Sequence, residues 1–317
     1  MPTLADIPTV TPEGFLYRFF VKPFSGAEVE TPMPHLLNRV FEGSRFGVFR
    51  IEQWVPHARF PIPPVRVSYH SLVFLKTGLL RRTDGLTTYD VGPQTVHLIT
   101  PGQIESSEFC HPDTTGFYCF FEESYFLEGA GNPRILAEMP FFKPGQPPLV
   151  RLSPERAVWL NDLFVRLEAE YLRSVEANGT DEQLLAATLL ALVLLELRRA
   201  YDPPPATAPT SAAAVLTARF KEAVSRHVLT RRGVSDYADL LAVTPNHLNR
   251  CVKETTGRPA SDFITDMLVL EARMLLRQTD LSSAEIAFRL RFSDASHFGK
   301  FFRRHTGQTP LDYRQSA

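Results

Sequence analysis

The last third of the chain repeats itself, and this repeat constrains the fold more than any other feature of the sequence. Shifted by 50 residues, the chain aligns with itself at His247 and His297, Leu248 and Phe298, Arg250 and Lys300, Lys253 and Arg303, Thr256-Gly257 and Thr306-Gly307, Asp262 and Asp312, and Phe263 and Tyr313. So many matches in one register rarely arise by chance, and a fixed period indicates repeated supersecondary units. We therefore expect two copies of one small helical unit.

Each copy has the pattern of a helix, a short turn and a second helix. The first copy is expected over Val234–Leu241 and Pro245–Thr256, and the other over Ser283–Leu290 and Asp294–His305. Thr244 is suited to cap the helix that follows it, because its hydroxyl can accept a bond from a free backbone N–H. A glycine after each second helix fits the left-handed residue that commonly ends a helix.

A helix over Asp262–Arg277 is expected to join the two copies. At 1.5 Å per residue it would span roughly 24 Å. Such a spacer could hold the two second helices about one turn of DNA, roughly 34 Å, apart.

The second helix of each copy has one apolar and one polar face. Helical spacing buries Leu248, Cys251 and Val252 in the first copy, and three phenylalanines in the other (Phe298, Phe301 and Phe302). Asn and Arg side chains can read base edges in the major groove of DNA. The outward residues, which we predict to contact DNA, are Asn246, Asn249, Arg250, Lys253, Ser296, His297, Gly299, Lys300 and Arg303.

The charge of the chain is divided unequally. Its net charge is −1, but residues 212–317 contain 16 basic and 11 acidic residues, whereas residues 1–211 contain 18 basic and 24 acidic residues. Such a division suggests a nucleic-acid-binding part and an acidic companion. Taken alone, this is weak evidence, because a net charge of +5 over about a hundred residues is common and also fits an ordinary solvated surface.

A proline-rich segment over residues 202–211 marks the clearest boundary. Four prolines in ten residues cannot continue a helix or fill a core, so we expect an extended linker. The predicted organisation is a β-rich domain over 1–150, a helical region over 151–201, the linker, and a helical DNA-binding domain over 212–317.

The β-rich domain is expected to be an antiparallel sandwich. Short β-prone runs separated by turn signals are typical of that fold class. These runs are Phe46–Val55, Ser71–Leu75, Thr87–Val91, Thr95–Ile99 and Gly116–Phe121. Residues after Pro154 change to helical spacing, and a second helix is expected from about Asp181 to Ala200.

The residues of the repeat resemble the AraC family of transcription regulators. Asp236–Arg250 with Lys253–Gly257 is similar to the first helix-turn-helix of that family. The second unit resembles its signature at Ile286-Ala287, Phe292–Asp294, Ser296–Phe298, Phe301–Arg303, Thr306-Gly307, Thr309-Pro310 and Tyr313-Arg314. The family usually has glycine at the turn where this chain has Arg291. If that residue needs a positive φ, arginine costs on the order of 1 kcal/mol there.

Residues 1–150 resemble the cupin-like sensor domain of the same family, in Leu72–Gly78, Gly85, Tyr89, Val91 and Ile99–Gln103. The resemblance implies a jelly roll that binds a small effector, followed by helices that form a dimer. The dimer stripe would then be Leu184, Leu185, Thr188, Leu189, Leu192 and Leu195, although a helix buried within one subunit explains the pattern nearly as well. By strand alternation, the candidates for lining an effector cavity are Arg50, Trp54, His70, Phe74 and Tyr118.

Neither a cofactor nor catalysis is expected from the sequence. Cupin enzymes typically bind a metal through a His-x-His pair with a following Glu and a later His, and the chain has no His-x-His. His70 and His97 are interpreted as pocket or core residues. With no signal peptide and no apolar stretch of membrane-spanning length, a cytoplasmic location is expected.

The sequence thus predicts a ligand-responsive transcription regulator, an activator by the commoner mode of the family. Its expected partners are double-stranded DNA, a small effector, RNA polymerase and a second copy of the chain. Two alternatives stay open. One is a cupin-type metalloenzyme fused to a DNA-binding module, and the other is a regulator whose β-domain binds a protein.

Overall fold

The computed structural model describes residues 9–11, 45–58, 60–130, 134–143, 146–177, 180–202 and 211–315. The chain divides into two compact units. One consists of Thr9–Asp84 and Thr88–Pro203, and the other is built chiefly from Pro204–Ala317. Apart from its two end residues, the predicted linker lies outside the described residues.

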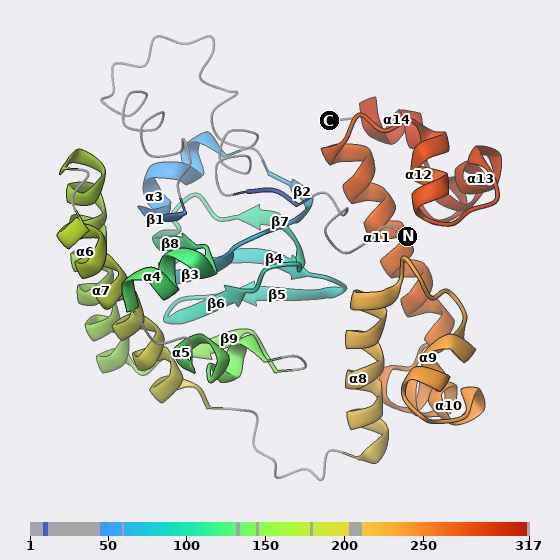
Figure 1. Cartoon of the computed structure of the whole chain (residues 1–317), viewed down its shortest axis with the longest axis horizontal. Coiled ribbons are helices and arrows are strands. Elements are labelled where there is room, and N and C mark those ends of the chain that lie inside the picture. The colour runs from blue at the N-terminus through green and yellow to red at the C-terminus, as the bar shows by residue number, and fades with distance from the viewer. Residues whose placement is uncertain are drawn as a thin grey trace. The chain divides into compact units, whose positions relative to one another are not determined.

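The first unit contains two antiparallel sheets (Figure 1). The five-stranded sheet has the order β1 (Phe46–Arg50), β8 (Thr115–Phe121), β3 (His70–Thr77), β6 (Thr95–Ile99) and β9 (Leu149–Arg151). The four-stranded sheet has the order β2 (Ile62–Arg66), β7 (Ile104–Cys110), β4 (Leu80–Asp84) and β5 (Thr87–Val91). This interleaving, 1-8-3-6 against 2-7-4-5, is that of a jelly roll, an architecture that cupins share. The predicted antiparallel sandwich is confirmed.

The strand predicted over Phe46–Val55 is wrong in its second half. The chain leaves the sheet after Arg50 and forms α3 (Ile51–Trp54) and the short η4 (Val55–His57). Burial explains the change of direction, because Ile51 and Trp54 both turn into apolar clusters of the sandwich. Strands β2, β4 and β7 were not predicted, because two prolines interrupt β2 and polar residues dominate much of the other two.

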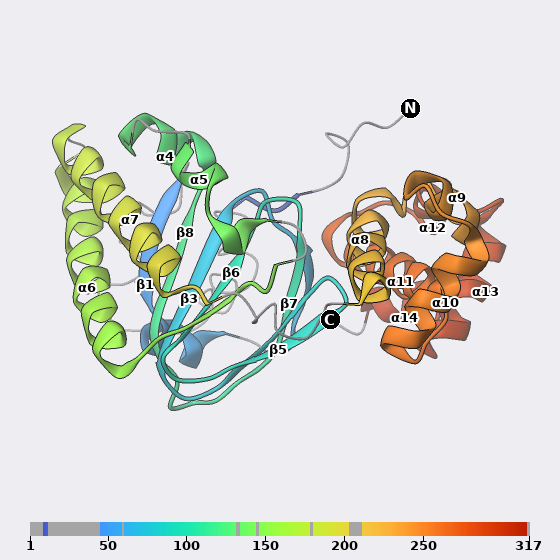
Figure 2. The same cartoon turned by 90° about the horizontal axis from the view of Figure 1, so that it is seen from below.

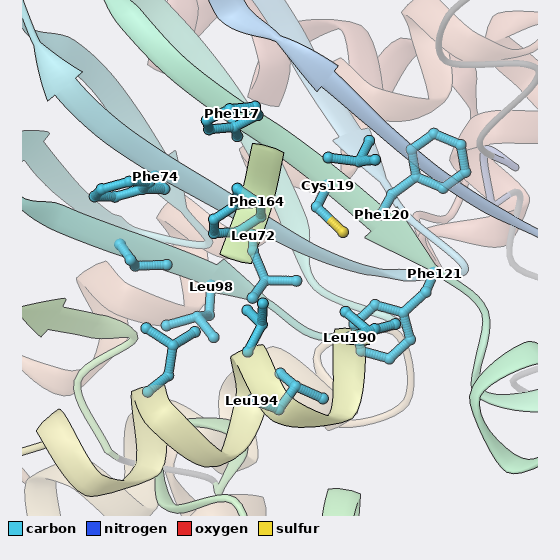
Figure 3. Packing of buried hydrophobic residues seen from close by; sticks show 14 of the residues in the cluster. Leu72, Phe74, Leu98, Phe117, Cys119, Phe120, Phe121, Phe164, Leu190 and Leu194 are labelled. Atoms are coloured by element: carbon cyan, nitrogen blue, oxygen red, sulfur yellow. The ribbon is translucent and has the colours of Figure 1, made fainter. Parts of the chain in front are cut away.

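Two long helices, α6 (Pro154–Ala177) and α7 (Thr180–Ala200), cover the outer face of the five-stranded sheet (Figure 2). Phe164 of α6 stacks on Phe74 and Phe117, with ring centroids 5.7 and 5.2 Å apart. Figure 3 shows Leu190 and Leu194 of α7 on the same side of the sheet. Shorter elements complete the unit: α4 (Glu123–Ala130), α5 (Arg134–Ala137) and η5 (Pro140–Phe142). The five-stranded sheet is therefore buried on both faces.

The second unit is helical and contains both copies of the repeat. Its helices are α8 (Ala212–His227), α9 (Val234–Leu240), α10 (Pro245–Thr256), α11 (Ala260–Gln278), α12 (Ser283–Arg289), α13 (Ala295–Thr306) and α14 (Pro310–Gln315). Each copy has its own apolar core, and α11 contributes to both, with Met267 in the first and Leu275 in the second. The predicted pairs of helices and the joining helix are confirmed. No helix within the described ranges is long and apolar enough to span a membrane.

Candidate nucleic-acid interface and effector cavity

The two second helices, α10 and α13, begin and end in the same way. Thr244 Oγ1 accepts a bond from His247 N at 3.2 Å, and Asp294 Oδ1 accepts one from His297 N at 2.7 Å. Each helix ends at a glycine in the left-handed conformation, with φ of 74° and 79°. The sequence repeat is thus a repeat of local geometry.

The turn before each second helix contains a non-glycine residue with positive φ. Ala242 has φ 56° and Arg291 has φ 55°. The next residue closes the same bond in both turns, from Val243 N to Ala238 O at 2.9 Å and from Phe292 N to Ala287 O at 2.8 Å. This bond belongs to the Schellman motif, which needs a left-handed residue. Arg291 therefore has the positive φ at which arginine is expected to cost free energy.

Most of the residues predicted to contact DNA lie on open faces of α10 and α13. The inward set is buried as predicted, except that Phe301 is only partly buried. Gly299 is half-buried, and a Cβ at this position would meet no atom within 4 Å. The exposed members of the outward set are Asn246, Arg250, Lys253, Ser296, His297, Lys300 and Arg303.

Asn249 is half-buried and has a structural role in the fold. Its Oδ1 accepts a bond from Ala260 N at 2.9 Å, at the first residue of α11. The side chain thus satisfies one of the backbone donors that the start of a helix leaves free. This bond links α10 to α11, and nothing in local helical spacing could have indicated it.

A contact between the two copies of the repeat was not predicted from the sequence. The guanidinium of Arg232 lies 4.2 Å from the ring centroid of Phe292, and its Nη1 donates to Arg291 O at 2.8 Å. Arg291 Nη1 donates in return to Thr230 O at 3.4 Å. The loop before α9 therefore contacts the turn before α13, and together with α11 it fixes the two copies relative to each other.

A cavity opens between the two sheets of the jelly roll. It has an empty volume of about 630 Å³, which includes space open to solvent. Its wall is mostly apolar, and α3 and the residues after it form part of that wall. The lining residues are Phe49, Ile51, Trp54, Val55, Ala58, Phe60, Ile62, Val73, Leu80, Arg82, Ser107, Cys110 and Tyr118.

Two of the five predicted cavity residues, Trp54 and Tyr118, line this space. The other three lie elsewhere. Arg50 is ion-paired with Glu168 of α6, with Nη2 and Oε2 2.7 Å apart. Phe74 packs under α6, and His70 stacks on Phe121 with ring centroids 4.9 Å apart. Burial lowers the pKa of His70 to about 4, so this ring is neutral at pH 7.

Arg82, on β4, is the cavity residue with the most unusual environment, and it was not among the residues predicted to line the cavity. Its side chain is 4% exposed, and its Nη2 is paired with Oε2 of the equally buried Glu105 on β7. Burial lowers the pKa of Arg82. Its position relative to Leu80 is the signal in the sequence, because residues two apart in a strand share one face.

In the part of the chain that the structure describes, no group of three or more His, Cys, Asp or Glu residues is placed to hold a metal ion. His97 is fully buried, and its pKa is lowered well below its usual value by burial and by the charge of Arg82.

Comparison with known proteins gives a consistent result. A family described as a helix-turn-helix domain matches residues 237–316. The arabinose operon regulatory protein of Salmonella typhimurium is 23% identical over 70% of this chain and 75% of its own length. The transcriptional activator RhaS of Escherichia coli is 36% identical over 25% of this chain and 28% of its own length.

Among solved structures, ToxT from Vibrio cholerae covers 85% of this chain and 97% of its own, with 13% identity and a TM-score of 0.39. A TM-score this low does not support the fold independently. The matched helix-turn-helix region, the doubled unit with its shared capping geometry, and the two named regulators agree with one another. Residues 237–316 are therefore a helix-turn-helix domain, and the chain is similar to transcription regulators of the AraC type.

Proposed function

We propose that the chain is a sequence-specific DNA-binding regulator, an activator of transcription that responds to a small effector. The repeated geometry of α10 and α13 carries this proposal. In helix-turn-helix proteins the second helix enters the major groove, with the residues of its first turns against the bases. Both helices here expose polar and basic side chains in those turns, and the two relatives named above are regulators.

The exposed residues divide into two roles. Asn246, Arg250, His297 and Lys300, with the smaller Ser296, are proposed to contact base edges, because they lie in the first half of each helix. Lys253 and Arg303, one turn later, are proposed to bind phosphates. We propose that Asn249 contributes through its amide nitrogen, since its oxygen is bonded to Ala260.

The jelly roll is proposed to be the sensor, without catalytic activity. A cavity between its sheets favours a small effector over a protein partner, for which a filled interior was the expected sign. We propose that residues 1–150 sense the effector, that 151–201 form a homodimer, and that 212–317 bind DNA after the linker at 202–211. RNA polymerase is the proposed partner at the promoter, and the cytoplasm the proposed location.

Selection of binding sites from a random DNA library by the full-length protein tests the proposal. We expect a motif with two informative blocks about one helical turn apart. Arg250→Ala should relax the preference in one block, and Lys300→Ala in the other, each with a loss of about 1–3 kcal/mol for the preferred sequence.

Arg226→Ala is the matched control. Arg226 is an exposed arginine on α8, paired with Glu222, and its removal changes the net charge by the same amount as Arg250→Ala. The control should enrich the same motif as the unaltered protein. If no sequence is enriched by the full-length protein at moderate salt, the proposal is wrong.

A further inference from the structure

Arg82 is one of the residues that line the cavity, and two nitrogens of its guanidinium have no hydrogen-bond acceptor among the described residues. Its side chain is 4% exposed. Nε and Nη1 are both buried, and neither has a hydrogen-bond partner among the described residues. A buried donor without an acceptor costs free energy that an incoming acceptor recovers. These two nitrogens of Arg82 can therefore donate hydrogen bonds to an acceptor group of a bound ligand.

Two residues on the cavity wall carry hydroxyls, which can also donate. Ser107 lies on β7 beside β4, and Tyr118 lies on β8 across the cavity. Tyr118 OH is 3.4 Å from Tyr69 OH, a long bond that a better acceptor could replace. Donors therefore reach the cavity from both sheets.

Two acidic side chains interact with Arg82, and their negative charge would oppose the binding of an anion there. Glu105 forms the ion pair at Nη2 and does not line the cavity. Asp84, on the same strand, interacts with the charge of Arg82, and burial raises its pKa to about 6. Glu105 thus engages one nitrogen of the guanidinium, whereas the other two are the ones left without acceptors.

The rest of the wall limits what can accompany the acceptor. Phe49, Trp54 and Phe60 supply aromatic surface, and Ile62, Val73 and Leu80 supply aliphatic surface. A molecule that fills such a space must be mostly apolar, because each polar group without a partner costs desolvation energy.

We propose that the effector is a small apolar carboxylate, whose oxygens bind Arg82 between the sheets while its aromatic or aliphatic body fills the cavity. This inference rests on the proposed function, since it names the class of effector for the sensor. A carboxylate offers two acceptor oxygens, and hydrogen bonds between charged groups are about twice as strong as neutral ones.

Tryptophan fluorescence provides a direct readout. The chain has two tryptophans, Trp54 in the cavity wall and Trp159 half-exposed on α6. Trp159→Phe leaves Trp54 as the single reporter. Titrations of this full-length variant without DNA would use benzoate, phenylacetate and hexanoate, each against its neutral amide (benzamide, phenylacetamide and hexanamide). We expect at least one carboxylate to bind, and at least about tenfold more tightly than its amide.

The variant that removes the site must not leave a buried charge behind. Arg82→Met alone would leave Glu105 unpaired, whereas Arg82→Met with Glu105→Met replaces the pair by apolar side chains of similar size. In the double variant the carboxylate should lose its advantage over the amide, while the amide binds as before. Retained amide binding shows that the cavity is still folded.

Three results would overturn the inference. They are binding of no carboxylate at millimolar concentration, equal binding of a carboxylate and its amide, or unchanged carboxylate binding in the double variant. These outcomes are independent of the selection of DNA sites. If the protein enriches a DNA motif but binds no carboxylate, the proposed function stands and the proposed class of effector is wrong.

Discussion

At the scale of single residues, the two turns of the repeat hold side chains in a conformation that favours glycine. Ala242 and Arg291 both have φ near 55°. Ala242→Gly should raise the free energy of unfolding of the helical unit by up to about 1 kcal/mol, because the left-handed conformation costs roughly 1–2 kcal/mol for other residues and glycine loses more entropy on folding. Helical circular dichroism during urea unfolding measures this change.

Arg291→Gly is the informative comparison. It relieves the same backbone conformation but removes the bond from Nη1 to Thr230 O. We therefore expect a smaller gain than for Ala242→Gly. An equal or larger gain would mean that the arginine side chain contributes nothing to the contact between the two copies.

The buried His70 makes the jelly roll sensitive to acid. Its pKa is about 4 in the folded protein and about 6.5 when unfolded, so the unfolded chain binds the proton first as pH falls. Its contribution to stability is complete above pH 6.5 and is lost towards pH 4, by about 2 kcal/mol between pH 7 and pH 5. Urea unfolding followed by tryptophan fluorescence reports on this unit, since both tryptophans lie in it.

His70→Leu should remove this part of the pH dependence. The buried His97 also has a lowered pKa and acts in the same direction, whereas the raised pKa of Asp84 acts in the opposite one. The difference between the variant and the unaltered protein isolates the single ring. Identical pH profiles would contradict the assignment of a neutral buried histidine.

At the scale of elements, Asn249 couples α10 to the start of α11. Asn249→Ala should destabilise the helical unit by about 1 kcal/mol, because the N–H of Ala260 loses its acceptor. Asn249→Asp keeps an acceptor and should keep the stability, yet it places a negative charge on the proposed DNA face. Comparing DNA affinity at equal folded fraction separates the two roles, and a stable Asn249→Ala variant would contradict the capping role.

Gly299 in α13 is a glycine that the described protein does not require. A Cβ there would meet no atom within 4 Å, and glycine inside a helix costs about 0.5–1 kcal/mol relative to alanine. Gly299→Ala should therefore stabilise the helical unit and weaken DNA binding, if DNA approaches the backbone here. Thermal unfolding and DNA titration together test this, and a variant with greater stability and unchanged affinity would refute the close approach.

The helical elements could be predicted from the sequence because their signals are local. The cavity could not, because it depends on which face of each strand is buried. Thr244, Pro245 and Gly257 are local signals, and each marks a helix end at its own position. In β3, by contrast, the six residues from His70 to Leu75 are all buried, because α6 and α7 cover one face and the second sheet covers the other. Alternation of polar and apolar residues then disappears.

The same loss of alternation explains why Arg50 was predicted for the cavity wall, which Phe49 lines instead. A shift of one residue moves a side chain to the other face of a sheet. Arg82 was missed because a charged residue in a short strand is expected to face solvent. Its burial depends on Glu105, which is 23 residues away and pairs with it only in the folded sandwich.

At the scale of the whole molecule, the outer surface of α7 is apolar where the sequence predicts a dimer. Leu184 and Leu185 are 51% and 53% exposed, Leu192 is 36% exposed, and Thr188 lies between them. Leu190 and Leu194, on the opposite face, pack into the core. The helix therefore has an inner face that holds it on the sheet and an outer apolar face that a second copy could cover.

Leu185→Glu should shift the protein from dimer to monomer, because a charge buried without a partner at an apolar interface is costly. Sedimentation of the full-length protein over a range of concentrations measures the change. The matched control is Leu86→Glu, which changes a leucine of similar character, 38% exposed, outside the helices. The Leu86→Glu variant should sediment as the unaltered protein does. At low concentration, both variants should have the same thermal unfolding as the unaltered protein.

The consequence for DNA follows from avidity. A dimer presents four second helices to its operator, and linked sites bind far more tightly than separate ones. Leu185→Glu should therefore weaken binding to a DNA fragment with two copies of the selected motif much more than binding to a fragment with one. An equal loss on both fragments would place the defect in the helical unit itself, and a monomeric unaltered protein would contradict the proposed dimer.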